Sequence, residues 1–322
     1  MLGKKLGVDL GTATTRVITR GEGALVAEPS VVAIRDGEPT LSMFGLAALE
    51  AAAEDSSLEL RRPLRGGDIT DLRALSALVH HALNRAVGRQ RIFKPDVVIA
   101  VRGGMSGDDR RAVLEAAVRA GSRTVYLIDA AIAAAMGAGV AVTSPRPHLV
   151  IDIGAGKMDV AVLSLEGTVA SRSLPVGSAD LFEALAAHVG SVHGVALSHA
   201  EQQSAARLLV AASHEERTGE VGGVLLSSHE LTGLVGDYLR PLDDGLLQVL
   251  EETPAGLRRD VKGSGLILTG GGARLEGLER HLAAVGGCSV RLAGEPEACT
   301  VRGTALAVDN LDVLKRNFMY IR

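Results

Sequence analysis

Residues 6–17 read Leu-Gly-Val-Asp-Leu-Gly-Thr-Ala-Thr-Thr-Arg-Val, and this stretch decides the fold. Apolar residues alternate up to Asp9, a small Gly- and Thr-rich turn follows, and a β pattern resumes at Val17. The pattern predicts two strands joined by a tight turn. Small residues in such a turn let backbone N–H groups bind an anion, and a nearby carboxylate can hold a hydrated Mg²⁺. An ordinary hairpin with one exposed aspartate explains this single stretch equally well.

A second copy of the pattern favours the anion-binding interpretation. Residues 149–162 read Leu-Val-Ile-Asp-Ile-Gly-Ala-Gly-Lys-Met-Asp-Val-Ala-Val. When Asp152 is placed on Asp9, Gly154 falls on Gly11. Two copies far apart in one chain indicate a duplicated unit. Two facing Asp–Gly turns can grip the phosphates of a nucleotide from both sides, so the sequence predicts nucleotide binding.

The composition is that of a globular α/β protein. The chain has 322 residues, 47% of them hydrophobic, which is enough for a large core and two domains. A net charge of −4 gives no global basic field, so nucleic acid is not an expected partner. The two cysteines form no CxxC pair and are expected to be reduced thiols in a cytosol. Lys4-Lys5 leads into a strand and no apolar run is long enough to span a bilayer, so neither signal peptide nor membrane helix is expected.

The remaining pattern alternates strands and helices. Thr70 or Asp71 is expected to cap a helix over residues 72–87, where apolar residues recur at helical spacing. The last helix is expected over residues 299–314, followed by a basic, aromatic tail over residues 315–322. Other helices are predicted over about 44–53, 107–120, 129–139, 231–250 and 276–284, and strands over 97–101, 124–128, 266–269 and 290–292.

Over nearly its whole length the sequence resembles the MreB family, the actin homologues of bacteria, which share a superfamily with sugar kinases and DnaK-type chaperones. The resemblance implies an actin-like α/β fold: two ribonuclease-H-like domains, each with a smaller subdomain, and a nucleotide cleft between them. Residues 1–145 would form the first domain, with a small subdomain at about 34–63. Residues 146–322 would form the second, with a small subdomain at about 179–241, and a last helix at about 303–316 could return to the first domain. The motifs that carry the resemblance are residues 9–13, 28–33, 62–64, 93–95, 110–113, 125–128, 152–154, 171–173, 268–273 and 310–316.

The same resemblance implies a site for ATP and Mg²⁺. Asp9 and Asp152 would hold the metal through water. Arg16 stands where conventional actin has a lysine that contacts phosphate, although a solvent-facing strand arginine is the equal alternative. The residues expected to contact the nucleotide are Asp9, Gly11, Thr12, Ala13 and Arg16, then Asp152, Gly154, Ala155, Gly156 and Lys157, and finally Gly270, Gly271 and Gly272.

Several positions depart from the family pattern. The family's catalytic glutamate, which orients the attacking water, is replaced by Ala130, and Asp129 lies one residue too early. Loss of a general base typically costs about 10²–10⁴ in rate. Ala155 adds a methyl group near the γ-phosphate, and Lys157 could either pair with phosphate or fill its space. Because the family's Glu-x-x-Lys is also replaced at about 206–210, ATP binding is expected to be weak and hydrolysis very slow or absent.

The resemblance implies a cytoskeletal protein in the cytoplasm that polymerises with itself at the inner membrane face and scaffolds cell-shape or cell-wall synthesis proteins. Ile92 and Phe93 lie where the family has an apolar pair that enters the bilayer, and their packing as core is the alternative. A nucleotide-free adaptor of other actin-like filaments is a second hypothesis for the function. A small-molecule kinase is a third and weaker one, because no catalytic aspartate stands outside the hairpins.

Overall fold

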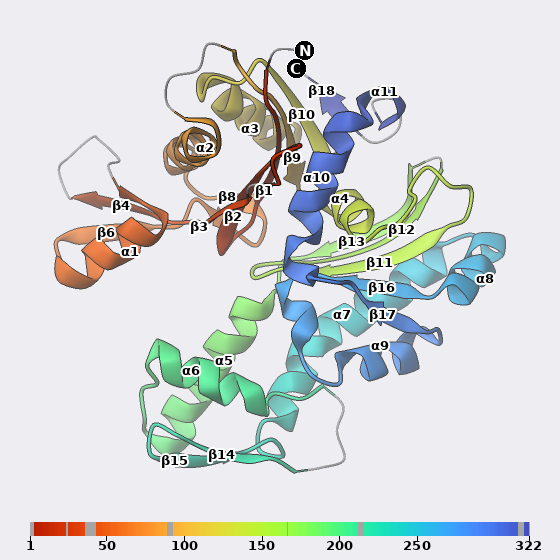
Figure 1. Cartoon of the computed structure of the whole chain (residues 1–322). Coiled ribbons are helices and arrows are strands. Elements are labelled where there is room, and N and C mark those ends of the chain that lie inside the picture. Colours follow the sequence, from red (N-terminus) through yellow and green to blue (C-terminus); the bar gives the residue numbers. More distant parts are fainter. Residues whose placement is uncertain are drawn as a thin grey trace. The chain divides into compact units, whose positions relative to one another are not determined.

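The computed structural model describes residues 3–23, 25–35, 43–88, 93–165, 167–211, 216–314 and 319–321 (Figure 1). The chain divides into two compact units. The first unit contains Met1–Ser144 and Glu297–Arg322, and the second contains Pro145–Pro296. Among the described residues, no helix is both long enough and apolar enough to cross a bilayer.

The first unit is built on a six-stranded sheet with the order β18-β10-β9-β1-β2-β3. Strand β1 pairs antiparallel with β2 and parallel with β9, so the hairpin predicted at residues 6–17 is present. The strands are β1 (Lys5–Leu10), β2 (Thr14–Thr19), β3 (Leu25–Pro29), β9 (Asp96–Val101), β10 (Thr124–Asp129) and β18 (Met319–Ile321).

Helices cover both faces of this sheet. Leu6 and Val8 point into a core shared with helices α2 and α3. Side chains alternate along a strand, so Gly7 points to the other face, where a Cβ would lie 2.6 Å from the Ala305 nitrogen. That face is covered by α10, which also packs on α4 (Figure 1). The helices are α2 (Leu72–Val87), α3 (Gly107–Arg119), α4 (Ala130–Gly137) and α10 (Cys299–Asp309).

The helix starts follow local capping chemistry. Asp71 accepts a hydrogen bond from the Ala74 backbone N–H at 2.9 Å, which confirms one of the two predicted caps of α2. Ser106 caps α3 by accepting from the Asp109 N–H at 3.0 Å. A smaller part of this unit is a three-stranded sheet, β5-β4-β6, with one helix beside it. Its elements are β4 (Val32–Arg35), β5 (Met43–Phe44), α1 (Gly45–Glu54) and β6 (Leu58–Arg61), and the hairpin of β7 (Leu64–Arg65) and β8 (Asp68–Ile69) follows.

The second unit repeats this arrangement. Its five-stranded sheet has the order β13-β12-β11-β16-β17, and β11 pairs antiparallel with β12 and parallel with β16. Its strands are β11 (His148–Ile153), β12 (Met158–Ser164), β13 (Gly167–Leu174), β16 (Leu266–Thr269) and β17 (Val290–Leu292), with a hairpin of β14 (Thr218–Val221) and β15 (Val224–Ser227). Its helices are α5 (Ser178–His193), α6 (His199–Ala205), α7 (Thr232–Glu252), α8 (Ala255–Ser264) and α9 (Leu278–Gly286).

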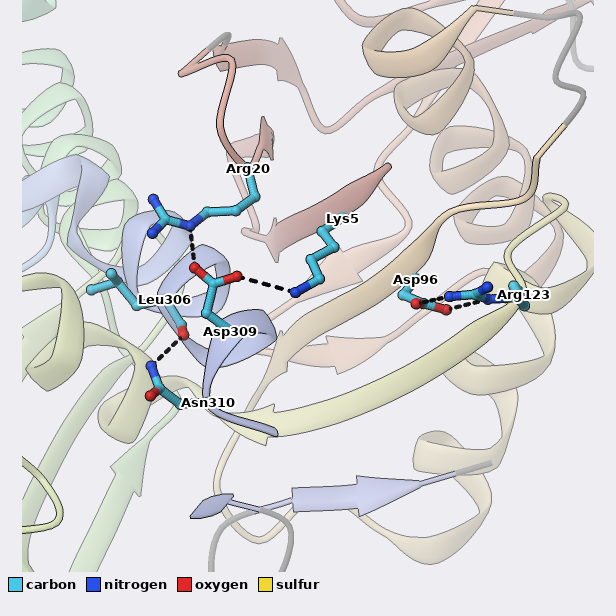
Figure 2. A network of polar contacts seen from close by, with 7 residues as sticks. All are labelled: Lys5, Arg20, Asp96, Arg123, Leu306, Asp309 and Asn310. Atoms are coloured by element: carbon cyan, nitrogen blue, oxygen red, sulfur yellow. Dashed lines mark hydrogen bonds and ion pairs between the residues drawn. The ribbon is translucent and has the colours of Figure 1, made fainter. Parts of the chain in front are cut away.

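The end of the chain differs from the prediction of one last helix, over 299–314 or about 303–316, and a basic, aromatic tail over residues 315–322. Helix α10 stops at Asp309, and a short α11 (Leu311–Leu314) follows. Asn310 breaks the helix, because its side-chain Nδ2 donates to the Leu306 carbonyl at 2.9 Å and occupies an end carbonyl (Figure 2). Residues 319–321 then form β18, which pairs antiparallel with β10. Part of the tail is therefore a strand of the sheet, and residues 315–318 and 322 lie outside the described residues.

Ion pairs fasten α10 to the sheet of the first unit. Asp309 accepts from Arg20 Nε at 2.5 Å and from Lys5 Nζ at 3.3 Å (Figure 2). The Arg20 hydrogen bond lowers the pKa of Asp309 below its usual value, so the carboxylate stays charged.

On the same sheet, Asp96 accepts from Arg123 Nε at 2.8 Å. Burial alone would raise the pKa of Asp96, but the bonds from Arg123 and Thr124 outweigh it and the net pKa is lowered.

Candidate functional site

The first candidate element is the β1–β2 hairpin. Asp9 lies opposite Arg16 across the two strands, and Arg16 Nη1 lies 3.8 Å from Asp9 Oδ2. Both side chains are largely buried, at 22% and 17% exposure, so Arg16 is not the solvent-facing arginine of the alternative interpretation. It belongs to the same local cluster as the aspartate that was predicted to hold a metal.

The turn of this hairpin is tightly held. A Cβ on Gly11 would lie 2.6 Å from the Thr14 carbonyl oxygen, so the backbone fold there requires glycine. Ser30, directly after β3, supports the turn by donating to the Gly11 carbonyl at 2.6 Å, while its own N–H donates to the Ala13 carbonyl at 2.9 Å. Sequence reasoning had assigned no role to Ser30, since its partners lie almost twenty residues earlier. Thr12 is half-buried and Ala13 is exposed at the tip of the turn.

The second candidate element is the β11–β12 hairpin. Asp152 is buried and accepts a hydrogen bond from Thr269 Oγ1 at 2.9 Å. Asp159 lies opposite Asp152 across the strands and is 4% exposed. Lys157 forms an ion pair with Asp159. Two roles were left open for Lys157: it could pair with phosphate or fill the phosphate space. The structure requires neither role, because Asp159 already neutralises the charge of Lys157.

Both aspartates occupy equivalent places in their units. Leu149 and Ile151 belong to the main core of the second unit, as Leu6 and Val8 do in the first. Because side chains alternate along a strand, Asp9 and Asp152 face the opposite side of their sheets. Each carboxylate stands at the end of a central strand, where oxygen ligands suit a hard cation such as Mg²⁺.

The turn after β11 lies against the start of α5. Gly154 closes the turn by donating to the Lys157 carbonyl at 2.8 Å. The N–H of Ser178 donates to the Gly154 carbonyl at 2.9 Å, and that of Ala179 donates to the Ala155 carbonyl at 2.8 Å. A Cβ on Gly177 would overlap this turn at Ala155 and Gly156. The first two N–H groups of α5 are therefore used to hold the turn at the positive end of the helix dipole.

The predicted glycine turn at Gly270–Gly272 also lies in the second unit. A Cβ on Gly270 would overlap the Ile153 carbonyl, and one on Gly272 would overlap the Ile153 side chain. These two glycines allow the 3₁₀ turn η2 (Gly271–Arg274) to pack on the end of β11. Gly271 is exposed, Gly272 is half-buried and Gly270 is buried. The structure thus brings this turn beside the second hairpin.

The catalytic position lies where β10 meets α4. Asp129 is the last residue of β10 and Ala130 is the first residue of α4, where it is 5% exposed. A methyl group at this position cannot accept a proton. Of the two apolar residues expected to enter the bilayer, Phe93 is 51% exposed, and Ile92 lies outside the described residues.

One polar cluster of the second unit was not identified from the sequence. His188 and His193 of α5 both contact Glu230 Oε1, at 2.8 and 2.7 Å. The hydrogen bond from His193 lowers the pKa of Glu230. The spacing of five residues does not match one helix face exactly, and Glu230 comes from a distant segment, so no local signal identified it. In the described part of the chain, no group of His, Cys, Asp or Glu has the arrangement to hold a metal ion.

Comparison with known proteins places these hairpins in context. The family model described as MreB/Mbl protein matches residues 3–316. The chain is 31% identical to the cell shape-determining protein MreB of Escherichia coli, with 97% of this chain and 95% of that protein aligned. Its structure is similar to that of MreB5 of Spiroplasma citri bound to ADP, with a TM-score of 0.87, 24% identity, and 98% and 99% of the two chains covered. It is also similar to a chain of the MamK double helical filament, with a TM-score of 0.79, 21% identity, and 95% and 98% covered.

Proposed function

The chain belongs to the MreB/Mbl family and has the actin-like fold, and from this premise we propose that it polymerises into filaments that help to determine cell shape. The observation that carries the proposal is the alignment of almost the whole chain with a cell shape-determining protein at 31% identity. A fold shared with the subunit of a double helical filament supports self-assembly. The proposed location is the inner face of the cytoplasmic membrane, together with cell-wall synthesis proteins.

ATP with Mg²⁺ is the proposed ligand of the two hairpins. The MreB5 relative binds ADP, and each hairpin here keeps an aspartate at a strand end and a tight glycine turn. When bound, Mg²⁺ would neutralise phosphate charge. The residues of the chain orient the ligand: Asp9 and Asp152 hold the hydrated ion, and the turns offer backbone N–H groups to phosphate oxygens.

We predict that Asp9→Ala lowers the affinity for ATP by about 10- to 100-fold, the size of one lost charge-assisted contact. Isothermal titration calorimetry with Mg-ATP measures this directly. Asp237→Ala is the matched control, because Asp237 is an exposed aspartate that pairs with Arg240 on α7. Tight ATP binding that Asp9→Ala leaves unchanged would contradict the assignment of the first hairpin.

We predict very slow hydrolysis by the natural chain and faster hydrolysis by Ala130→Glu, because the variant restores a general base. The buried position of Ala130 means that the longer side chain also costs stability. Phosphate release is the measurement, and Ala130→Gln, which has the same size but accepts no proton, is the control. A natural rate equal to that of active family members would show that another group, such as Asp129, performs the step.

Sedimentation with and without ATP tests the function itself. Filaments that pellet only with ATP support the proposal. The alternative is a nucleotide-free adaptor of other actin-like filaments, which the Lys157–Asp159 ion pair and Ala130 favour. An adaptor would stay in the supernatant under both conditions and pellet only with a second actin-like protein. Release of ADP that depends on an added sugar would instead indicate a small-molecule kinase.

A further inference from the structure

The first unit contains a hollow that the proposed nucleotide site does not use. Its volume is about 550 Å³, and it is bounded by one face of α2, by Phe44 of β5, by Lys94 and by the end of α3. Among the described residues, the lining includes five basic side chains and no carboxylate. These five are His80, His81, Arg85, Lys94 and Arg119, and together they are called the basic pocket.

The charges of the basic pocket are only partly used within the protein. Arg85 lies 3.1 Å from Glu28, and Arg119 lies 3.7 Å from Glu115. A guanidinium has five N–H donors, so each arginine keeps donors for another acceptor. Lys94 is exposed, and in the portion of the chain that the structure describes it has no ion-pair partner. The pocket therefore offers several cationic donors to one acceptor-rich group.

Rigid elements hold the pocket in shape. The imidazole of His81 stacks on the ring of Phe44, with centroids 4.8 Å apart and planes at 20°. The backbone of Lys94 is fixed from the other side, because a Cβ on Gly3 would lie 2.5 Å from the Lys94 carbonyl oxygen. The backbone that carries the basic groups therefore needs little rearrangement before a ligand binds.

The position of Phe93 indicates which anion fits. Phe93 is 51% exposed and directly precedes Lys94, which lines the pocket. Consecutive Cα atoms are about 3.8 Å apart, so the exposed Phe93 leaves the backbone one residue from the pocket wall. In a membrane the phosphate groups lie directly above the apolar chains, and basic pockets at that level bind anionic headgroups.

We propose that the basic pocket binds the phosphate headgroup of an anionic membrane lipid while Phe93 enters the apolar layer. The inference rests on the membrane location proposed above and adds a lipid preference to it. A soluble phosphate compound has the same acceptor chemistry, but it gives no role to the exposed phenyl ring beside the pocket.

The test compares vesicle co-sedimentation of the full chain on phosphatidylglycerol and on neutral phosphatidylcholine vesicles. Lys94→Gln with Arg119→Gln removes two pocket charges from exposed side chains. The matched control is Arg111→Gln with Arg240→Gln, which removes two equally exposed charges elsewhere. We expect the pocket variant to lose at least about tenfold in affinity for phosphatidylglycerol vesicles and the control less than threefold, with unchanged thermal unfolding.

The outcomes separate the pocket from the membrane proposal. Equal loss in the pocket and control variants, or equal binding of the natural chain to both lipids, overturns the headgroup pocket and leaves membrane binding intact. Failure of the natural chain to pellet with either vesicle overturns membrane binding and the pocket with it. Calorimetry with glycerol phosphate tests whether the pocket binds a soluble phosphate compound instead. If the natural chain binds glycerol phosphate and the pocket variant does not, while both pellet equally with vesicles, the pocket binds a soluble phosphate and the lipid proposal is overturned.

Discussion

Replacing Gly303 by alanine is expected to destabilise the first unit by about 3 kcal/mol or more, the upper range for overpacking a closely packed interior. Gly303 lies on α10 where this helix crosses α4, and a Cβ there would overlap the Ala133 carbonyl. The contact is reciprocal, because a Cβ on Gly137 of α4 would overlap the Cys299 carbonyl of α10. The obstacle in both cases is backbone, which cannot rotate away as a side chain can.

Denaturant unfolding followed by circular dichroism measures this loss. Gly107→Ala is the matched control in the same unit, since Gly107 is helical and has no atom within 4 Å of its built Cβ. That variant is expected to change stability by less than about 1 kcal/mol, in the stabilising direction. If Gly303→Ala unfolds at the same denaturant concentration as the natural chain, the close crossing of α4 and α10 is wrong.

The double variant Ile92→Ser, Phe93→Ser is expected to lose most of its binding to anionic vesicles. Burying one large apolar side chain contributes about 1.5–3 kcal/mol, so the pair accounts for roughly 10²- to 10⁴-fold in affinity per subunit. A filament multiplies weak binding by avidity, so the loss grows with assembly. The exposed phenyl ring of Phe93 is the structural support, because a core residue would be buried.

Liposome co-sedimentation tests this expectation with folded protein. Val192→Ser with Leu225→Ser removes two exposed apolar side chains of the second unit and is the control. Equal pelleting of the natural chain and the Ile92–Phe93 variant would exclude this pair as the anchor. The basic, aromatic tail is the second candidate anchor. It is tested by charge substitutions at Lys315 and Arg316, because deleting residues 315–322 would also remove β18 from the sheet.

The fold could be predicted because its signals are local and duplicated. The two Asp–Gly hairpins and the cap at Asp71 all depend on residues within one turn or one strand pair. The break at Asn310 could not be predicted, because the apolar spacing of α10 continues through Leu314. Strand β18 was missed because it has only three residues, and its pairing partner is almost two hundred residues earlier in the chain.

The candidate site was predictable in position but not in its contacts. The sequence predicted that Asp152 and Lys157 lie on one hairpin. The residues that bond to these two side chains were identified only from the structure. Thr269 reaches Asp152 from β16, and Asp159 takes the charge of Lys157. The Thr269 contact depends on strand order and register, which residue type alone does not specify, whereas Lys157 and Asp159 are only two positions apart in the sequence.

The division of the chain has a consequence for its synthesis on the ribosome. The second unit is one continuous segment, but the first needs residues 297–322 to be complete. Every residue of α4 from Ala130 to Met136 is buried in the finished protein, and α10 is its main partner. While translation proceeds, the second unit can fold from its own residues, whereas the apolar surface of α4 waits uncovered for α10. The apolar surface of α4 is therefore open to aggregation until α10, which follows the whole second unit in the sequence, has been made.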